Sequence, residues 1–441
     1  MKMRNRILLL CACTAIISSC NTQGNKELTQ ITRWPDGKTG AVSLTYDDAT
    51  ANQFHKAVPI MNDLNLKATF FINTGAIKGS KYRGTFIGRP VQEIIKETAT
   101  TPTDSSNFYE RSSAAAYLGL KGTLQYQLNA GAAIDAGRPA RAYRIIDELY
   151  RKVRHGDFPP LKGEKYEILD TVDASWDDLR KIAAQGHEFA SHMVTHPRLG
   201  ALDEPNIKYE LEKSREELLD QLGERHTFSA EVPFGTENEM AMDYALKVYP
   251  ALRNRMPEPY LTELNRGSRK QPGTAETEYV QWQRGAVKRT PLPMMESWID
   301  TTLVHNNIWL VLVFHGVDGI GWEALPSELL KEYFTYLKSK EDNLWIATFG
   351  DVTKYMRERM NSDIKTEKKS REITVDITNS LDTTMYNIPL TLKTYIPSRW
   401  KDVQVVQDNS EATVNQQQDS TGYYVLYHAI PNIGKVTLSS R

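Results

Sequence analysis

Two histidines stand four positions apart in the stretch Ser191 to His196, which reads SHMVTH. A spacing of four brings two imidazoles to one side of a helix or tight turn, where both can reach a single cation. An isolated pair of this kind is more often structural than ligating, because satisfied histidines are the commoner case. His192 and His196 are therefore candidate metal ligands that need a third partner.

Two adjacent carboxylates, Asp47 and Asp48, follow an apolar run that ends at Tyr46. Neighbouring side chains at a strand end project differently, so one can bind a metal while the other handles a proton. One aspartate and the two histidines would form a site with open positions for water, which is the catalytic form of zinc coordination. Taken alone, the Tyr-Asp-Asp triplet more often begins a loop or caps a helix.

Short apolar runs alternate with amphipathic segments between residues 41 and 348, and this pattern predicts a parallel sheet, either doubly wound or closed into a barrel. Strands are predicted at 41–46, 68–73, 187–190, 227–232, 308–314 and 344–348, and helices at 53–64, 175–184, 205–222, 240–249, 294–304 and 327–338. Asp47, His192 and His315 each follow a predicted strand. They should converge on one edge of the sheet, where such folds carry their chemistry.

Two regions depart from this alternation. Residues 78–173 are too long for a connection and contain helical stretches at 110–128 and 139–153, so we expect a helical insertion that covers the site or shapes its specificity. After the basic run 365–369 the apolar period changes to two, with Ile373, Val375 and Ile377 alternating. This predicts a small β-sandwich domain over residues 370–441.

Four motifs in order resemble those of the polysaccharide deacetylases of carbohydrate esterase family four, the NodB homology group. They are Thr45-Tyr46-Asp47-Asp48, SHMVTH, Pro233-Phe234-Gly235 and Phe314-His315-Gly316-Val317. The resemblance covers roughly residues 41–75, 176–235 and 294–352, and Met193 replaces the usual hydroxyl residue of the second motif. It implies a distorted (β/α) barrel as the catalytic domain, over residues 31–364.

The resemblance also implies roles for single residues. Asp48, His192 and His196 would hold a divalent cation, with zinc favoured, Asp47 would be the general base, and His315 the general acid. The backbone N–H of Phe234 would meet the charge that develops on the acetyl oxygen.

Softer expectations concern the surroundings of these residues. Trp322, on a glycine-rich loop after His315, either stacks on a sugar or packs under its own loop. The partner that orients His315 is unassigned, and Asp300 is the only guess. The β-sandwich either binds carbohydrate or is a plain structural domain, because its alternating aromatic residues fit both.

One position departs from the family pattern. Glu231 stands two residues before the proline of the third motif, where the family has an arginine that orients the base. A carboxylate there should raise the pKa of a nearby Asp47. Either another arginine, such as Arg89 or Arg284, takes over in space, or the base is tuned differently, or catalysis is impaired.

The implied activity is hydrolytic removal of acetyl groups from a carbohydrate, with N-deacetylation of an amino-sugar polymer favoured, which makes the protein a hydrolase of non-peptide carbon–nitrogen bonds. The alternatives are a carbohydrate O-acetyl esterase and a catalytically silent carbohydrate-binding protein. The 54 basic and 55 acidic side chains give a net charge of −1, which removes any broad electrostatic case for nucleic acid and leaves a local basic patch open. Nothing in the sequence indicates an oligomeric state.

The first thirty residues have the layout of a bacterial lipoprotein signal. Residues 1–19 carry basic residues, an apolar run and small residues before Cys20, so we expect a signal peptide. Ile17-Ser18-Ser19-Cys20 resembles a bacterial lipobox, which implies a lipidated Cys20 and a tether over residues 20–30, and the alternative is an ordinary cleaved signal that happens to contain cysteines. Because all three cysteines lie in the first twenty residues, the mature body can form no internal disulfide. The expected location is the cell envelope, on the outer membrane, with the lipid anchor as the only membrane contact.

Overall fold

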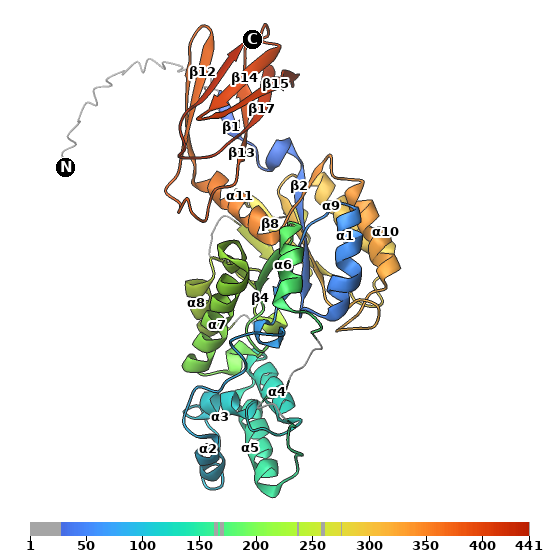
Figure 1. Ribbon diagram of the computed structural model, residues 1–441, viewed down its shortest axis with the longest axis vertical. Coiled ribbons are helices and arrows are strands. Elements are labelled where there is room, and N and C mark those ends of the chain that lie inside the picture. The colour runs from blue at the N-terminus through green and yellow to red at the C-terminus, as the bar shows by residue number, and fades with distance from the viewer. Residues whose placement is uncertain are drawn as a thin grey trace, which may run out of the picture.

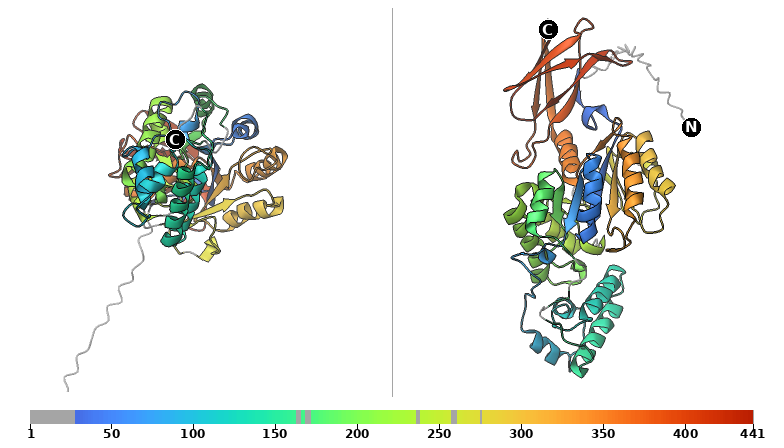
Figure 2. Two further views of the ribbon diagram at one scale, coloured as in Figure 1. Left: turned by 90° about the horizontal axis from the view of Figure 1, so that it is seen from below. Right: turned by 45° about the vertical axis from the view of Figure 1, so that its right-hand side comes forward.

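The structure of the protein, a computed structural model, describes residues 28–162, 166–167, 172–235, 238–256, 261–274 and 276–440. Three regions follow one another along the long axis: a helical insertion at one end, a sheet with helices in the middle, and antiparallel sheets at the other end (Figures 1 and 2). The expected signal peptide, Cys20 and the first part of the tether lie outside the described residues. No helix in the described part of the chain is both long and apolar enough to cross a bilayer.

The middle region is built on a nine-stranded, all-parallel sheet of order β6-β5-β4-β3-β2-β9-β8-β7, with β10 also paired to β2. The strands are β2 (Gly40–Asp47), β3 (Ala68–Ile72), β4 (Glu188–Ser191), β5 (Ser229–Ala230), β6 (Ala251–Leu252), β7 (Leu261–Leu264), β8 (Tyr279–Gly285), β9 (Ile308–Phe314) and β10 (Leu344–Ile346). The curled sheet with surrounding helices confirms the predicted distorted barrel. Strands β6, β7 and β8 were not predicted, since two of the three are only two to four residues long.

The helices around the sheet follow the predicted alternation. They are α1 (Val58–Asp63), α6 (Trp176–Ala184), α7 (Glu204–Leu222), α8 (Glu239–Val248), α9 (Leu292–Val304), α10 (Ser327–Lys338) and α11 (Phe349–Asn361). Helix α6 begins with the predicted capping box, in which Ser175 and Asp178 satisfy each other's backbone N–H groups. The helix expected over residues 53–64 begins as a π-helical turn (Gln53–Ala57) and continues as α1.

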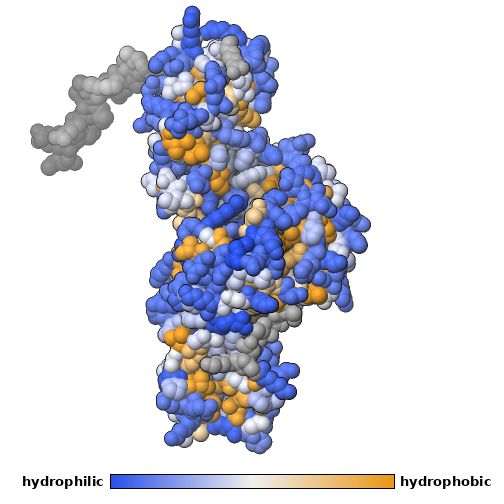
Figure 3. All heavy atoms as spheres, viewed as in Figure 1, coloured by the Kyte–Doolittle hydropathy of each residue, from blue (hydrophilic) through white to orange (hydrophobic). Residues whose placement is uncertain are grey.

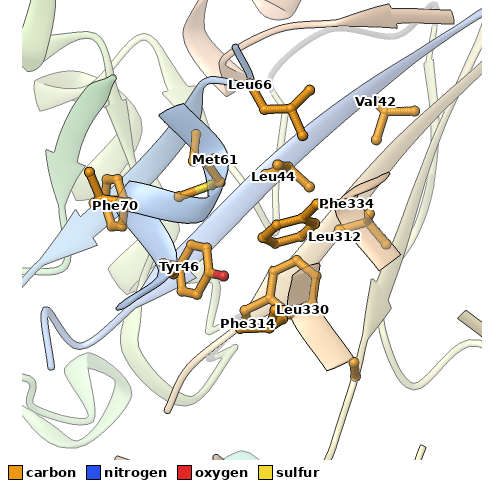
Figure 4. Packing of buried hydrophobic residues seen from close by; sticks show 14 of the residues in the cluster. Val42, Leu44, Tyr46, Met61, Leu66, Phe70, Leu312, Phe314, Leu330 and Phe334 are labelled. Atoms are coloured by element: carbon orange, nitrogen blue, oxygen red, sulfur yellow. The ribbon is translucent and has the colours of Figure 1, made fainter. Parts of the chain in front are cut away.

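Alternate residues of the central strands face two different cores. Leu44 and Tyr46 of β2 pack against Leu312 and Phe314 of β9 and against helices α1 and α10 (Figure 4). The residues between them, such as Thr45, face the barrel interior instead. This alternation, which follows from the two-residue period of a strand, directs Asp47 at the end of β2 into the interior.

The helical insertion stands at the end of the barrel where the parallel strands finish (Figure 1). Its helices are α2 (Val91–Glu97), α3 (Phe108–Ala115), α4 (Thr123–Asp135) and α5 (Pro139–His155). The single helix expected over 110–128 is wrong, because Gly119 and Gly122 take left-handed conformations (φ 66° and 92°) that separate α3 from α4. Hydrophobic side chains gather over the insertion on the face shown in Figure 3.

The C-terminal region forms two antiparallel sheets, of orders β1-β13-β17-β16 and β11-β12-β18-β14-β15. Their strands are β1 (Thr29–Ile31), β11 (Asp363–Lys368), β12 (Glu372–Thr378), β13 (Leu390–Tyr395), β14 (Asp402–Gln407), β15 (Ser410–Asn415), β16 (Gln417–Gln418), β17 (Tyr423–Ala429) and β18 (Val436–Ser440). The two sheets enclose one apolar core. Strand β1 lies in the segment expected to be a tether, and it pairs with β13.

Candidate active site

Asp48, His192 and His196 come together although they lie on separate segments of the chain. The Nε2 atoms of His192 and His196 are 3.6 and 3.2 Å from Oδ1 of Asp48, and one ligand atom from each residue lies within 4.8 Å of the others. Oδ1 of Asp48 is buried and has no hydrogen-bond partner in the described part of the chain. Three converging ligands with an unsatisfied carboxylate oxygen fit a divalent cation.

The surroundings of His192 prepare it for metal binding. Its Nδ1 lies 2.8 Å from the carbonyl oxygen of Glu231, so a proton on Nδ1 donates to that carbonyl and leaves Nε2 free to face Asp48. Burial lowers the pKa of His192 to about 4. The imidazole is therefore neutral at neutral pH, and this is the form that binds a metal.

The loops that carry these residues have unusual backbone conformations. Asp48, His196 and Phe234 have positive φ angles of 78°, 61° and 65°, a region that residues other than glycine seldom occupy. Such conformations cost about 1–3 kcal/mol each and persist where surrounding contacts enforce them, which occurs most often at functional sites.

Glu210, on α7, supplies one of the enforcing contacts. Its carboxylate is buried and accepts hydrogen bonds from the backbone N–H groups of Val194 and Thr195 at 2.8 and 2.9 Å, and from the Thr195 hydroxyl at 2.6 Å. These bonds fix the short loop between His192 and His196. Glu210 lies in a strongly charged segment with helical spacing, so the sequence did not indicate that it would hold this loop.

Asp47 is held by an arginine that the sequence did not reveal. Nη1 and Nη2 of Arg253, directly after β6, donate to its two carboxylate oxygens at 2.7 and 2.6 Å, and Nη1 also donates to the Thr45 hydroxyl at 2.9 Å. The two candidates expected for this place are wrong: Arg89 pairs with Glu110 in the insertion, and Arg284 stacks on a tryptophan ring.

The charge balance around Asp47 reverses the expected pKa shift. Burial raises the pKa of Asp47, but the Arg253 guanidinium and the His315 imidazole lower it by more, so the net pKa lies well below its ordinary value. Glu231 instead carries the raised pKa. Its Oε1 is 3.1 Å from Arg253, its Oε2 has no described hydrogen-bond partner, and burial raises its pKa to about 7 against the opposing effect of Arg253.

His315 lies beside Asp47, with its Nε2 3.3 Å from Oδ2 of the carboxylate. Burial lowers the pKa of His315, although Asp47 and Asp48 oppose that shift. Gln53 connects the two strand ends, because its side-chain amide donates to the backbone carbonyl oxygens of both Asp47 and His315. Asp300, the expected orienting partner, is elsewhere: it accepts a hydrogen bond from Tyr336 on the outer helices.

Two exposed aromatic rings flank the site. Phe234 is 39% exposed and its ring lies edge-on to His196 at 4.7 Å, while Trp322 is 53% exposed and lies edge-on to His315 at 4.7 Å. The guanidinium of Arg198 stacks over the Phe234 ring at 4.2 Å. The exposure of Trp322 contradicts the alternative in which it packs beneath its own loop.

The site therefore combines a candidate cation site with a buried, ionised carboxylate and a neutral imidazole. Such groups can hold a divalent cation, accept a proton from water and return a proton to a leaving group. All of them lie at the carboxyl ends of parallel strands, as expected. The missed members, Arg253, Gln53 and Glu210, act by holding the others.

Parts of the chain are similar to known proteins. A gellan lyase from Bacillus sp. is 27% identical over 280 residues, which are 59% of this chain but 11% of the relative's length. Among solved structures, a putative polysaccharide deacetylase from Mycobacterium smegmatis is 14% identical, with 75% of this chain and 94% of that one covered and a TM-score of 0.40. A family 4 carbohydrate esterase from Bacillus anthracis is 11% identical, with 74% and 86% covered and a TM-score of 0.32.

The family comparison is more direct. Residues 35–106 and 162–249 match the sequence profile of the family described as polysaccharide deacetylase. The matched residues include Asp47, Asp48, His192 and His196, whereas Arg253 and His315 lie beyond them. The insertion interrupts the match, and the C-terminal sheets lie outside it. These two segments, which together make up less than half of the chain, are therefore similar to a polysaccharide deacetylase domain.

Proposed function

We propose that the protein removes acetyl groups from a carbohydrate by metal-dependent hydrolysis. The observation that carries this proposal is the convergence of Asp48, His192 and His196 beside the Arg253-bound carboxylate of Asp47 and the imidazole of His315. A binding protein would need neither a positioned base nor an acid. The match to the polysaccharide deacetylase profile supports an acetylated saccharide as the substrate class.

Asp48, His192 and His196 would hold a divalent cation, with zinc favoured by two nitrogen ligands and one oxygen ligand. When bound by these residues, a divalent cation would lower the pKa of water and polarise a carbonyl group. Asp47 is ionised at neutral pH because its pKa is low, and Arg253 fixes the direction of both its oxygens. A carboxylate of such low basicity accepts a proton only from an acidified water, which matches the presence of a cation site beside it.

His315 would return the proton to the departing group. Its Nε2 is 3.3 Å from Oδ2 of Asp47, so one proton can pass between base and acid within the site. An amine leaves only after protonation, and this requirement favours N-deacetylation for a site that retains the histidine. The backbone N–H of Phe234, in its left-handed turn, would donate to the oxygen of the tetrahedral intermediate.

O-deacetylation is the alternative reaction, because an ester passes through the same tetrahedral oxyanion. The third possibility, a silent binding protein, depended on the replacement of the usual arginine by Glu231. That replacement is offset here, since Arg253 supplies the guanidinium from the neighbouring strand.

Acetate release tests the proposal. The full chain is incubated with acetylated chitin oligomers, peptidoglycan fragments and acetylated xylan, with and without added zinc. Asp47→Asn should keep one equivalent of metal and lose acetate release, Asp48→Asn should lose both, and Asp300→Asn, on the outer helices, should keep both. Metal binding by the unchanged protein without acetate from any substrate would favour the silent binding protein.

We also propose that the protein is a lipoprotein of the bacterial cell envelope, anchored through Cys20 to the outer membrane. Incorporation of labelled palmitate in the producing cell should occur in the natural chain and be lost in Cys20→Ser. Equal labelling of both proteins, or of neither, would contradict this.

A further inference from the structure

Basic residues gather after strand β7 and around the end of β8. The connection over residues 265–278 carries three cations in its first half and two acids, Glu276 and Glu278, at its end, and residues 284–291 contain another three cations and no acid, in a chain whose net charge is −1. The six side chains form what we name the basic rim: Arg266, Arg269, Lys270, Arg284, Lys288 and Arg289. A charge excess of this kind is usually a solvated face, so its position decides its meaning.

The rim lies beside the candidate acid. Strands β7 and β8 continue the sheet next to β9, and His315 directly follows β9. Because all three strands are parallel, the connections after β7 and β8 leave the sheet at the same edge as His315. The basic rim therefore borders the candidate active site on the side away from the metal ligands, which follow β2 and β4.

Arg266 reaches from the rim toward the barrel interior. Gln283, two residues before Gly285, points inward and donates to the backbone carbonyl of Arg253, so position 285 faces inward as well. A Cβ atom at Gly285 would lie 2.8 Å from Cδ of Arg266, so the aliphatic part of the Arg266 side chain occupies the space that a larger residue at position 285 would need. Its positive charge also contributes to lowering the pKa values of His315 and Glu231.

The six cations lack the acidic partners that other cations of the site have. Arg253 and Arg198 pair with Asp47 and Asp135, but no rim side chain forms an ion pair with a carboxylate among residues 28–440 as far as they are described. Five of the six are exposed, whereas Arg284, between the inward-facing positions 283 and 285, is half-buried and stacks over Trp282 at 4.5 Å on the outer face of the sheet. The charge of the five exposed side chains is thus available to an external anion.

We propose that the basic rim binds a carboxylate of the substrate, so that the protein acts on an acetylated glycan that contains uronic acid. Arg266 is the central residue, because the planar guanidinium forms two parallel hydrogen bonds to a carboxylate, and Arg269 is its neighbour on the same connection. A glycan is favoured over a nucleic acid because the cations occupy two local segments of a sheet whose other strands match a polysaccharide deacetylase profile, rather than a long basic stripe. The statement that the bound glycan is also acetylated rests on the proposed function.

Binding tests the rim without requiring catalysis. The full chain is titrated by calorimetry with a galacturonic acid tetramer, with chitotetraose as the uncharged comparison, at low and at physiological salt. The natural protein should bind the uronate at least about tenfold more tightly than chitotetraose, and Arg266→Ala/Arg269→Ala should lose that advantage. The affinity for the uronate should also fall as salt rises.

Two further variants control this experiment. Lys365→Ala/Lys368→Ala removes the same charge from β11, at the opposite end of the molecule, and should keep the affinity within about twofold. Arg266→Lys/Arg269→Lys keeps the charge without the forked geometry and should lie between the natural protein and the alanine variant. Thermal melting of each variant identifies any that fails to fold, and the lysine variant then carries the test.

Three results would overturn the inference. They are no preference of the natural protein for the uronate, equal losses in the rim and β11 variants, and a single-stranded oligonucleotide of four phosphates that binds more tightly than the uronate through the same two arginines. Acetate release from acetylated polygalacturonate, compared with the same polymer reduced at its carboxyl groups, then tests the link to catalysis. Absence of acetate from both polymers would refute this link to catalysis and leave the binding result standing, whereas the proposed function fails only if none of its own test substrates releases acetate.

Discussion

Replacement of Arg253 by methionine isolates the feature that distinguishes this site. The substitution keeps the volume of the side-chain stem but removes the guanidinium that is bonded to both oxygens of Asp47 and paired with Glu231. Asp47 and Glu231 would remain as two buried carboxylates. Breaking a buried ion pair in this way costs about 3–5 kcal/mol, so the free energy of unfolding at pH 7 should fall by that order.

The pH dependence of the variant follows from the direction of the pKa shift. In the natural protein the pKa of Asp47 is lowered, so its contribution to stability is present above its unfolded pKa and is lost as pH falls through the folded value. Without Arg253, burial dominates and the pKa of Asp47 should rise above its ordinary value. The acidic limb of kcat/KM should therefore move to higher pH, and activity at pH 7 should fall by about 10²–10⁴-fold, the range that a positioned base contributes.

The assay is acetate release between pH 4 and 9, with thermal melting at each pH. Arg253→Met/Glu231→Gln removes one of the two carboxylates as well, so it should recover much of the stability without recovering activity. Arg253→Lys keeps the charge but loses the bidentate contact, and its acidic limb should stay closer to that of the natural protein. A methionine variant with an unchanged acidic limb, or with a stability loss below about 1 kcal/mol, would refute this account of the site.

The remaining predictions concern neighbouring residues. Removal of metal by a chelator should lower the melting temperature of the natural protein. If the free metal had been at 100 times its Kd, the loss corresponds to about 3 kcal/mol of folding free energy. The melting temperature of His196→Ala should remain nearly unchanged by the chelator. The pKa of Glu231 is raised to about 7, so ionisation of this carboxyl destabilises the folded state as pH rises above the pKa of Glu231 in the unfolded chain. Glu231→Gln should therefore raise the melting temperature more at pH 8 than at pH 5. An equal gain at both pH values would contradict the raised pKa of Glu231. Glu210→Gln should weaken metal binding by about 10–100-fold, measured by competition with a chromogenic chelator, because the loop that carries His196 loses its charged acceptor.

The sequence predicted the parts of the site that depend on long, apolar strands. Strands β2 and β9 are seven or eight residues long and buried on both faces, so their ends were located within a residue or two. Asp47 is the last residue of β2 and His315 directly follows β9, and their meeting at one edge follows from a parallel arrangement alone. The same reasoning located His192 after β4.

The parts that were missed depend on short elements and on contacts between distant residues. Strand β6 consists of Ala251 and Leu252, which is too short for any apolar period to be visible. Arg253, which follows it, therefore could not be placed beside Asp47, and the pKa of Asp47 was predicted with the wrong sign. Two isolated carboxylates would raise each other's pKa, as predicted for Asp47 and Glu231. In the fold, however, both carboxylates pair with the buried guanidinium of Arg253.

The insertion shows the same limit, and it also connects distant regions. Arg198, two residues after His196, donates to Asp135 of α4 at 2.8 Å and stacks on Phe234, whose ring lies against His196. A Cβ atom at Gly131 of α4 would lie 2.7 Å from Cδ of Arg198, so the glycine makes room for this stem. One chain of contacts thus runs from the insertion to a candidate metal ligand. The insertion thus helps to hold the exposed ring of Phe234 in place, although most of the insertion lies outside the residues that match the family profile. It therefore takes part in shaping the site that the barrel supports.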